Sequence, residues 1–140
     1  MELIKYIEIE NRFNQMKESK YSNEEKILIL HRDIVDAITS SKELIKDFKG
    51  ITATYGWKKE QAILNDAQMN INSLDTKYRK TFKSFIDSSQ ISSSEINQLN
   101  KLMQEVLYSY RRVIDYCYSK LLPKVKQESS NAYIYSGESP

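Results

Sequence analysis

Apolar residues recur at steps of three and four along four separate stretches of this sequence, and this period constrains the fold more than any other feature. In the first stretch the recurring residues are Tyr6, Ile9, Phe13 and Met16. Such steps place side chains on one face of an α-helix, which turns once every 3.6 residues, so four amphipathic helices are predicted. The other three stripes are Ile27, Leu30, Ile34, Ala37, Leu44 and Phe48; Trp57, Leu64, Ala67, Ile71, Leu74, Tyr78, Phe82 and Phe85; and Ile96, Leu99, Met103, Val106, Tyr110, Val113, Cys117 and Leu121.

Two serine-to-glutamate spacings mark where helices begin. Ser22 is followed three residues later by Glu25, and Ser92 is followed three residues later by Glu95. In such a capping box the serine hydroxyl accepts a hydrogen bond from a free backbone N–H, and the glutamate carboxylate accepts one in return. Gly50 is expected to end the second helix, because glycine adopts the left-handed conformation of a helix C-terminus without steric cost.

Short connections between four such helices predict an all-α fold, an antiparallel up-down-up-down four-helix bundle with a shorter first helix and a polar C-terminal tail. Three glycines and two prolines in 140 residues are too few for the many turns of an all-β fold. An alternative is a long helical hairpin of the third and fourth helices that dimerises as a coiled coil, since their stripes keep nearly strict a and d positions. Residues 1–126 are expected to form the bundle domain and residues 127–140 the tail.

The C-terminal tail is a candidate docking segment. Pro123 is expected to end or kink the fourth helix at Leu122, because its ring clashes with the preceding turn. The short first helix should leave an apolar groove at the end of the bundle where the tail begins, walled by residues such as Phe48, Trp57 and Leu121. Because an open apolar groove requires a cover, we predict that the tail docks there or in the groove of a neighbouring copy or partner; the alternative is a free tail. Its one apolar island is Tyr133, Ile134 and Tyr135.

Composition narrows the class of protein. The formal net charge is +2 at pH 7, which by itself is too small to indicate a nucleic-acid or membrane protein. Cys117 is the one cysteine, so the chain can form no internal disulfide and fits a reducing compartment. Acidic residues interrupt the N-terminus MELIKYIEIE, which is unlike a signal peptide, and no apolar run approaches the roughly 18 residues of a membrane span. A soluble, cytoplasmic protein is expected.

Motifs for catalysis are missing from the sequence, so we expect a protein that is not an enzyme and that binds no cofactor, metal or small-molecule substrate. The glycines, at positions 50, 56 and 137, are too dispersed for a phosphate-binding loop. One histidine and one cysteine do not make a zinc or di-iron pattern. Asp33 and Asp36 lie on a helix rich in Lys and Arg, where we interpret them as solvated surface acids.

Two alternative functions depend on particular residues. His31, in LHRDIVDAI, could accept a phosphoryl group on a bundle helix, although its register with Ile38 and Ile45 favours a partly buried residue at the edge of the core. Basic residues in DTKYRKTFK and YRRVIDYCYSKLLPKVK could bind nucleic acid through the third and fourth helices. However, the two runs lie towards opposite ends of an antiparallel hairpin and form no contiguous stripe.

A second stripe on the fourth helix is the candidate partner-binding surface. It runs along the side opposite the core stripe, at steps of three and four. Tyrosine and arginine dominate the energy of many protein contacts because they combine a large area with a polar group. The alternative is an ordinary wet surface on which arginine pairs with Asp115 and the tyrosines lie along the helix. The stripe consists of Tyr108, Arg111, Asp115, Tyr118 and Leu122.

These features favour a non-catalytic helical module that binds a protein partner, or another copy of itself, through a helix face. An adaptor, chaperone, inhibitor or immunity protein fits this description. A subunit of a larger assembly, such as a virion, fits it equally, because a helical bundle alone does not determine function.

Overall fold

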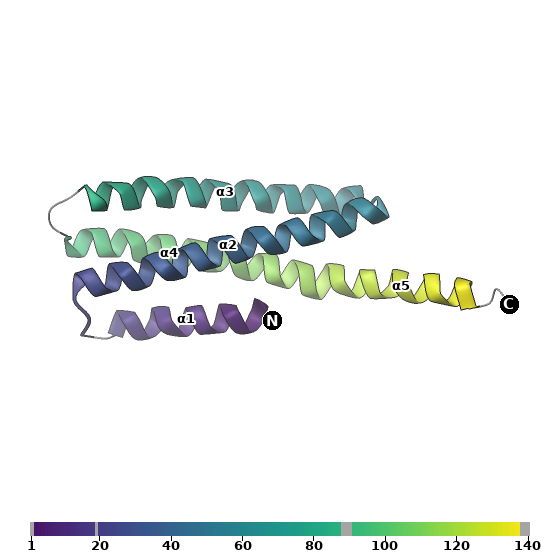
Figure 1. Ribbon diagram of the computed structural model, residues 1–140, viewed down its shortest axis with the longest axis horizontal. Coiled ribbons are helices and arrows are strands. Elements are labelled where there is room, and N and C mark those ends of the chain that lie inside the picture. Colours follow the sequence, from purple (N-terminus) through teal and green to yellow (C-terminus); the bar gives the residue numbers. More distant parts are fainter. Residues whose placement is uncertain (1, 19, 88–90, 138–140) are drawn as a thin grey trace.

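The computed structural model describes the backbone of residues 2–18, 20–87 and 91–137, with the side chains of residues 3–17, 20–87 and 91–129. It confirms the predicted antiparallel four-helix bundle with a short first helix (Figure 1). Its described residues form no strand. The elements are α1 (Glu2–Glu18), α2 (Asn23–Tyr55), α3 (Lys58–Ile86) and a fourth rod made of α4 (Ser93–Asp115), a π-helical turn (Tyr116–Leu121) and α5 (Leu122–Gly137).

The bundle is arranged around its second and fourth helices. α2 and α4, which run in the same direction, share the most extensive contact, and α1 and α3 pack on opposite sides of this pair without touching each other. α1 lies beside only the first part of α2, so the far half of the bundle is built from α2, α3 and the fourth rod (Figure 1). The predicted stripes supply the core, which includes Ile9, Ile34, Ile71, Leu99 and Val106.

Both predicted serine N-caps begin helices, and the first of them forms the complete capping box. At α2 the Ser22 hydroxyl accepts a hydrogen bond from the backbone N–H of Glu25 at 3.2 Å, and the Glu25 carboxylate accepts one from the Ser22 N–H at 3.4 Å. At α4 the Ser92 hydroxyl accepts a hydrogen bond from the Glu95 N–H at 3.3 Å. These local bonds satisfy backbone groups that the helices themselves leave unpaired.

The prediction that Gly50 ends the second helix is wrong. α2 continues to Tyr55 and stops at Gly56, whose φ of 71° is the left-handed conformation expected of a helix C-terminus. A glycine inside a helix costs only about 1 kcal/mol relative to alanine. Burial of Thr52 and partial burial of Ile51 in the following turn offset that cost.

Pro123 was predicted to end or kink the fourth helix at Leu122, and it does not end it. α4 widens into the π turn, in which the N–H of Leu122 bonds to the carbonyl of Cys117 five residues earlier, and α5 then continues through Pro123. The wider turn makes room where a proline ring would meet a carbonyl in a regular α-helix. The predicted boundary between residues 126 and 127 therefore falls inside α5, whose backbone runs outward past the turn between α2 and α3 (Figure 1).

Two ion pairs attach α1 to α2, and one of them corrects the interpretation of Asp33 as a solvated acid. Asp33 is only 2% exposed, and its carboxylate receives hydrogen bonds from the Arg12 guanidinium, the shortest at 2.9 Å. The Lys5 ammonium lies 3.2 Å from Asp36 and 3.1 Å from the Ser40 hydroxyl, in a more exposed setting. Asp33 therefore belongs to the interface between the two helices, because a buried carboxylate requires a charged partner.

Among the described helices, none has a stretch long and apolar enough to cross a membrane.

Replacing Arg12 with methionine should lower the free energy of unfolding by about 2–4 kcal/mol, because it leaves the Asp33 carboxylate buried without its partner. Lys5→Met, which removes an exposed pair, should cost less than about 1 kcal/mol. Urea denaturation of both variants measures the difference. Adding Asp33→Leu to Arg12→Met should recover much of the loss, and equal costs for the two single variants would contradict the buried-pair interpretation.

Candidate functional site

The residues of the predicted partner-binding stripe lie in three different environments. Tyr108 is 66% exposed, and the Arg112 guanidinium lies over its ring at 5.7 Å. Arg111 pairs with Asp115 at 3.1 Å, one turn along the same helix. Tyr118 is half-buried, with its ring edge-on to that of Phe48. Leu122, the last member of the stripe, is half-buried as well. The stripe is therefore not one continuous outward surface, and Tyr108 is its most exposed aromatic residue.

Tyr108 stands beside a groove between α3 and α4, here named the Tyr108 groove, of about 680 Å³. Its floor is apolar and buried, with Leu64, Leu74 and Val113. Ile63, 40% exposed, forms part of the opposite wall. An apolar floor reached past an exposed tyrosine is the kind of surface that accepts a side chain from a binding partner.

Three carboxylates and one guanidinium line the Tyr108 groove, and two cations just outside the lining pair with two of those carboxylates. Lys77 lies 3.3 Å from the Glu105 carboxylate, and Arg111 neutralises Asp115 in the same way. Inside the groove the Asn70 amide donates a hydrogen bond to the Ser109 hydroxyl at 3.0 Å, which joins α3 to α4. The groove is therefore specific by shape and apolar contact more than by charge.

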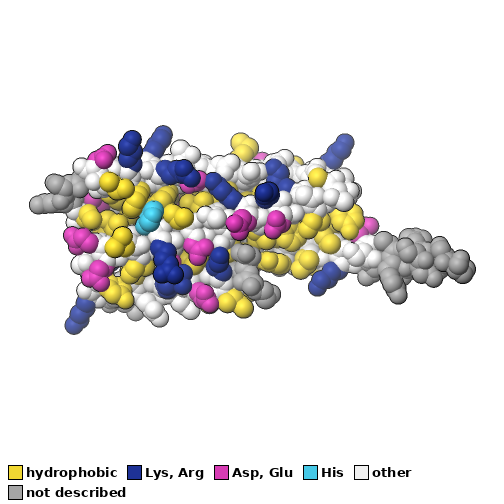
Figure 2. All heavy atoms as spheres, viewed as in Figure 1, with side chains coloured by type: hydrophobic (Ala, Val, Ile, Leu, Met, Phe, Trp, Pro, Cys, Tyr) yellow, Lys and Arg dark blue, Asp and Glu magenta, His cyan; other side chains and the backbone are white. Residues whose placement is uncertain are grey.

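A second groove, here named the His31 groove, lies between α2 and α3 and has a volume of about 360 Å³. The His31 ring stacks on Phe82, with ring centroids 4.3 Å apart, and its Nδ1 shares a hydrogen bond with the Tyr78 hydroxyl. Burial raises the pKa of Tyr78, which keeps the phenol neutral. On the face drawn in Figure 2 the single histidine lies among hydrophobic side chains. His31 is thus partly buried at the edge of the core, as its register predicted.

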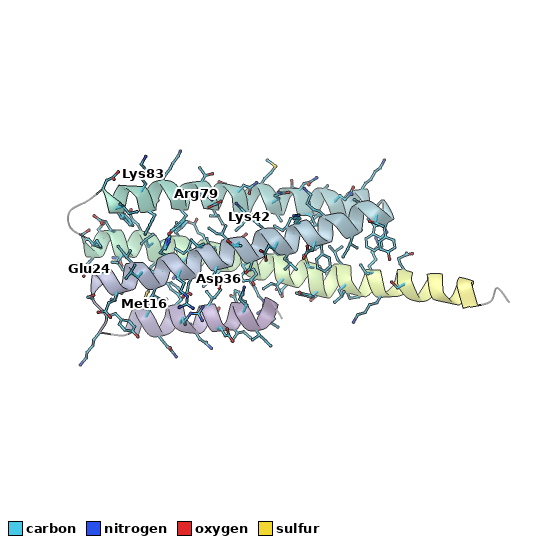
Figure 3. The ribbon with its side chains drawn as sticks, viewed as in Figure 1. Met16, Glu24, Asp36, Lys42, Arg79 and Lys83 are labelled. Atoms are coloured by element: carbon cyan, nitrogen blue, oxygen red, sulfur yellow. The ribbon has the colours of Figure 1, made fainter. Side chains whose placement is uncertain are left out.

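Cationic side chains from both helices line the His31 groove. Lys42 of α2 lies 2.6 Å from the Asp75 carboxylate of α3, and Arg79 lies 3.0 Å from it. Burial alone would raise the pKa of Asp75, but the hydrogen bonds from Lys42 and Arg79 outweigh it and hold that pKa below its ordinary value. Lys83, one turn after Arg79, also lines the groove and makes no ion pair with any described residue (Figure 3).

The end of the bundle where tail docking was predicted differs from the open apolar groove that was expected. Phe48 and Leu121, two expected walls of an open groove, are buried. Trp57 stacks on Tyr55 with centroids 4.7 Å apart, and the Lys124 ammonium of α5 lies 4.2 Å from the Trp57 ring centroid. The start of α5 therefore contacts this end of the bundle, while its backbone runs outward and does not fold back (Figure 1).

The side chains of the apolar island lie outside the described residues. Docking of this island on a neighbouring copy or a partner therefore stays a prediction. Its members are Tyr133, Ile134 and Tyr135.

Chemically reactive groups are few in the part of the chain that the structure describes. Cys117 is fully buried, and burial raises its pKa to about 12, so the thiol stays protonated. No three His, Cys, Asp or Glu side chains among the described residues gather as metal ligands would.

Exchanging Asp75 for asparagine should remove part of the stabilisation that the protein gains as pH rises through the acid range. The depressed pKa of Asp75 means that the folded state binds fewer protons than the unfolded state there. Its contribution is complete above the unfolded pKa of about 3.9 and is lost as pH falls through the lower folded pKa. Melting temperatures between about pH 2 and pH 6 test this in Asp75→Asn. The matched control is Asp66→Asn, an exposed carboxylate; equal pH profiles for the two variants would contradict the assignment.

Comparison with protein-family models, curated proteins and solved structures finds no match to this chain.

Proposed function

We propose that this chain is a non-catalytic helical module that binds a protein partner through the Tyr108 groove. The observation that carries the proposal is an aromatic side chain two-thirds exposed to solvent, held beside an open groove with a buried apolar floor. Exposed tyrosine next to arginine is typical of residues that supply most of the energy in protein interfaces. The Arg112 guanidinium lies over the Tyr108 ring at 5.7 Å, so these two side chains can be contacted together by a partner.

Within this proposal a partner inserts an apolar side chain between Ile63 and Tyr108, above the floor formed by Leu64 and Leu74. An adaptor, an inhibitor or a subunit of a larger assembly would each use such a surface. We place this role in the cytoplasm, because a chain with Cys117 as its one cysteine fits a reducing compartment.

The two alternative functions have less support. Nucleic-acid binding needs a contiguous stripe of free cations, whereas Lys77 on α3 and Lys124 on α5 pair with carboxylates of the same chain. Phosphotransfer needs an accessible imidazole, whereas His31 is stacked on Phe82 and hydrogen-bonded through Nδ1. We therefore propose neither.

Tyr108→Ala should abolish partner capture while changing the free energy of unfolding by less than about 0.5 kcal/mol, since the side chain is mostly exposed. The measurement is affinity capture from cells of the native host, followed by mass spectrometry of the co-isolated proteins. Met69→Ala is the matched control, because Met69 is 70% exposed on α3 but does not line the groove.

A protein captured by the native chain and by Met69→Ala, but not by Tyr108→Ala, would support the proposal. Capture of the same proteins by all three chains would show that the Tyr108 groove is not the binding surface. A large fall in stability of Tyr108→Ala would show that this tyrosine serves the fold.

A further inference from the structure

The His31 groove combines features that a packed bundle does not need. Its floor holds the buried Ile38 and Tyr78, which the core explains. Its edges, in contrast, expose large apolar side chains: Val35 is 41% exposed and Ile86 is 68% exposed. Leu28, 67% exposed, lies on α2 one turn before His31. Exposed aliphatic residues around an apolar floor are unfavourable in water unless another molecule covers them.

The charge around this groove is one-sided. Three cations and one carboxylate line it, which leaves an excess of two positive charges. Asp75 is shared by Lys42 and Arg79, so neither cation is fully balanced, and Lys83 has no ion-pair partner among the described residues. An occupant of this groove would therefore need acidic groups next to its apolar ones.

The opposite flank of α2 shows how this bundle accommodates a helix. There α1 covers α2 and brings two basic side chains, Arg12 and Lys5, to Asp33 and Asp36. On the other flank α3 packs against α2, and the groove between these two helices is lined by Lys42, Arg79 and Lys83 with one carboxylate, Asp75. From His31 to Lys42 is about 16 Å along α2, enough for about three turns of a helix.

We propose that the His31 groove binds an acidic amphipathic helix of a partner protein. Its apolar residues, spaced at three and four, contact Val35, Phe82 and Ile86, and its Asp or Glu side chains pair with Lys83 and Arg79. This proposal is independent of the Tyr108 groove, since the two grooves share no lining residue. A chain with both surfaces can bridge two partners on either side of α3.

The probe is a fluorescein-labelled synthetic helical peptide with leucines at steps of three and four and glutamates on its flanks. Fluorescence anisotropy with the full chain should show binding. A peptide with lysines in place of the glutamates should not bind, and a scrambled acidic peptide of the same composition should bind at least about tenfold more weakly.

Lys83→Glu should weaken binding of the acidic peptide by about tenfold or more, because it places like charges opposite each other. Lys80→Glu makes the same charge change three residues away on an exposed position outside the groove, and should change the affinity by less than about threefold. Ile86→Asp tests the apolar contact and should also weaken binding. Tyr108→Ala should leave the affinity unchanged, which separates this proposal from the function proposed for the Tyr108 groove.

Four results would overturn the proposal: absence of binding, equal binding of the scrambled peptide, preference for the basic peptide, or equal losses in Lys83→Glu and Lys80→Glu. A rise in mass with concentration, measured by light scattering and abolished by Lys83→Glu, would assign the groove to a second copy of this chain instead.

Discussion

Contact between α2 and α4 holds the bundle together, since α1 and α3 each pack on this pair and not on each other. In a square four-helix bundle the second and fourth helices are diagonal and their side chains meet only across the centre. In this bundle α2 and α4 are in direct contact along their lengths, so α1 and α3 lie on opposite outer sides of the pair. This contact is consistent with a first helix of only 17 residues, because α2, α3 and α4 each contact the other two without it.

The same arrangement gives α2 two different flanks. One flank carries Asp33 and Asp36 and is covered by the basic side chains of α1; the other carries His31 and Lys42 and faces α3. The His31 groove lies between this second flank and α3, and the Tyr108 groove lies between α3 and α4. Both grooves therefore border α3, the long helix that packs on the outside of the pair of α2 and α4.

Sequence predicted those features that depend on neighbouring residues. The apolar period predicted the helices, and Ser22 and Ser92 predicted two of their starts, because amphipathicity and capping act within one or two turns. Gly50 does not end the second helix and Pro123 does not end the fourth, since tertiary packing and a π turn can outweigh a local helix-breaking tendency. The burial of Asp33 could not be predicted, because its partner Arg12 lies on another helix and their meeting depends on how the helices align.

In the candidate sites too, features set by neighbouring residues were predictable and features set by packing between helices were not. The position of His31 at the edge of the core was predictable from its register with Ile38. The division of the stripe from Tyr108 to Leu122 depends on other helices, because Arg111 lies over Tyr6 of α1 and Tyr118 lies against Phe48 of α2. The cations of the His31 groove come from two helices, Lys42 from one and Arg79 and Lys83 from the other, so only the packed structure brings them together.

The π turn has a consequence for how the length of this chain can vary. A π turn holds about one residue more than the α-helical turn it replaces. Loss of a single residue between Tyr116 and Leu121 can therefore be absorbed by a return to α-helical geometry, with Val113 before it and Lys124 after it keeping their orientations. A single-residue loss in the middle of α2 or α3 would instead rotate every later side chain by about 100° and turn the core face outward. Insertions and deletions in the helices of evolutionary relatives should accordingly concentrate at this turn.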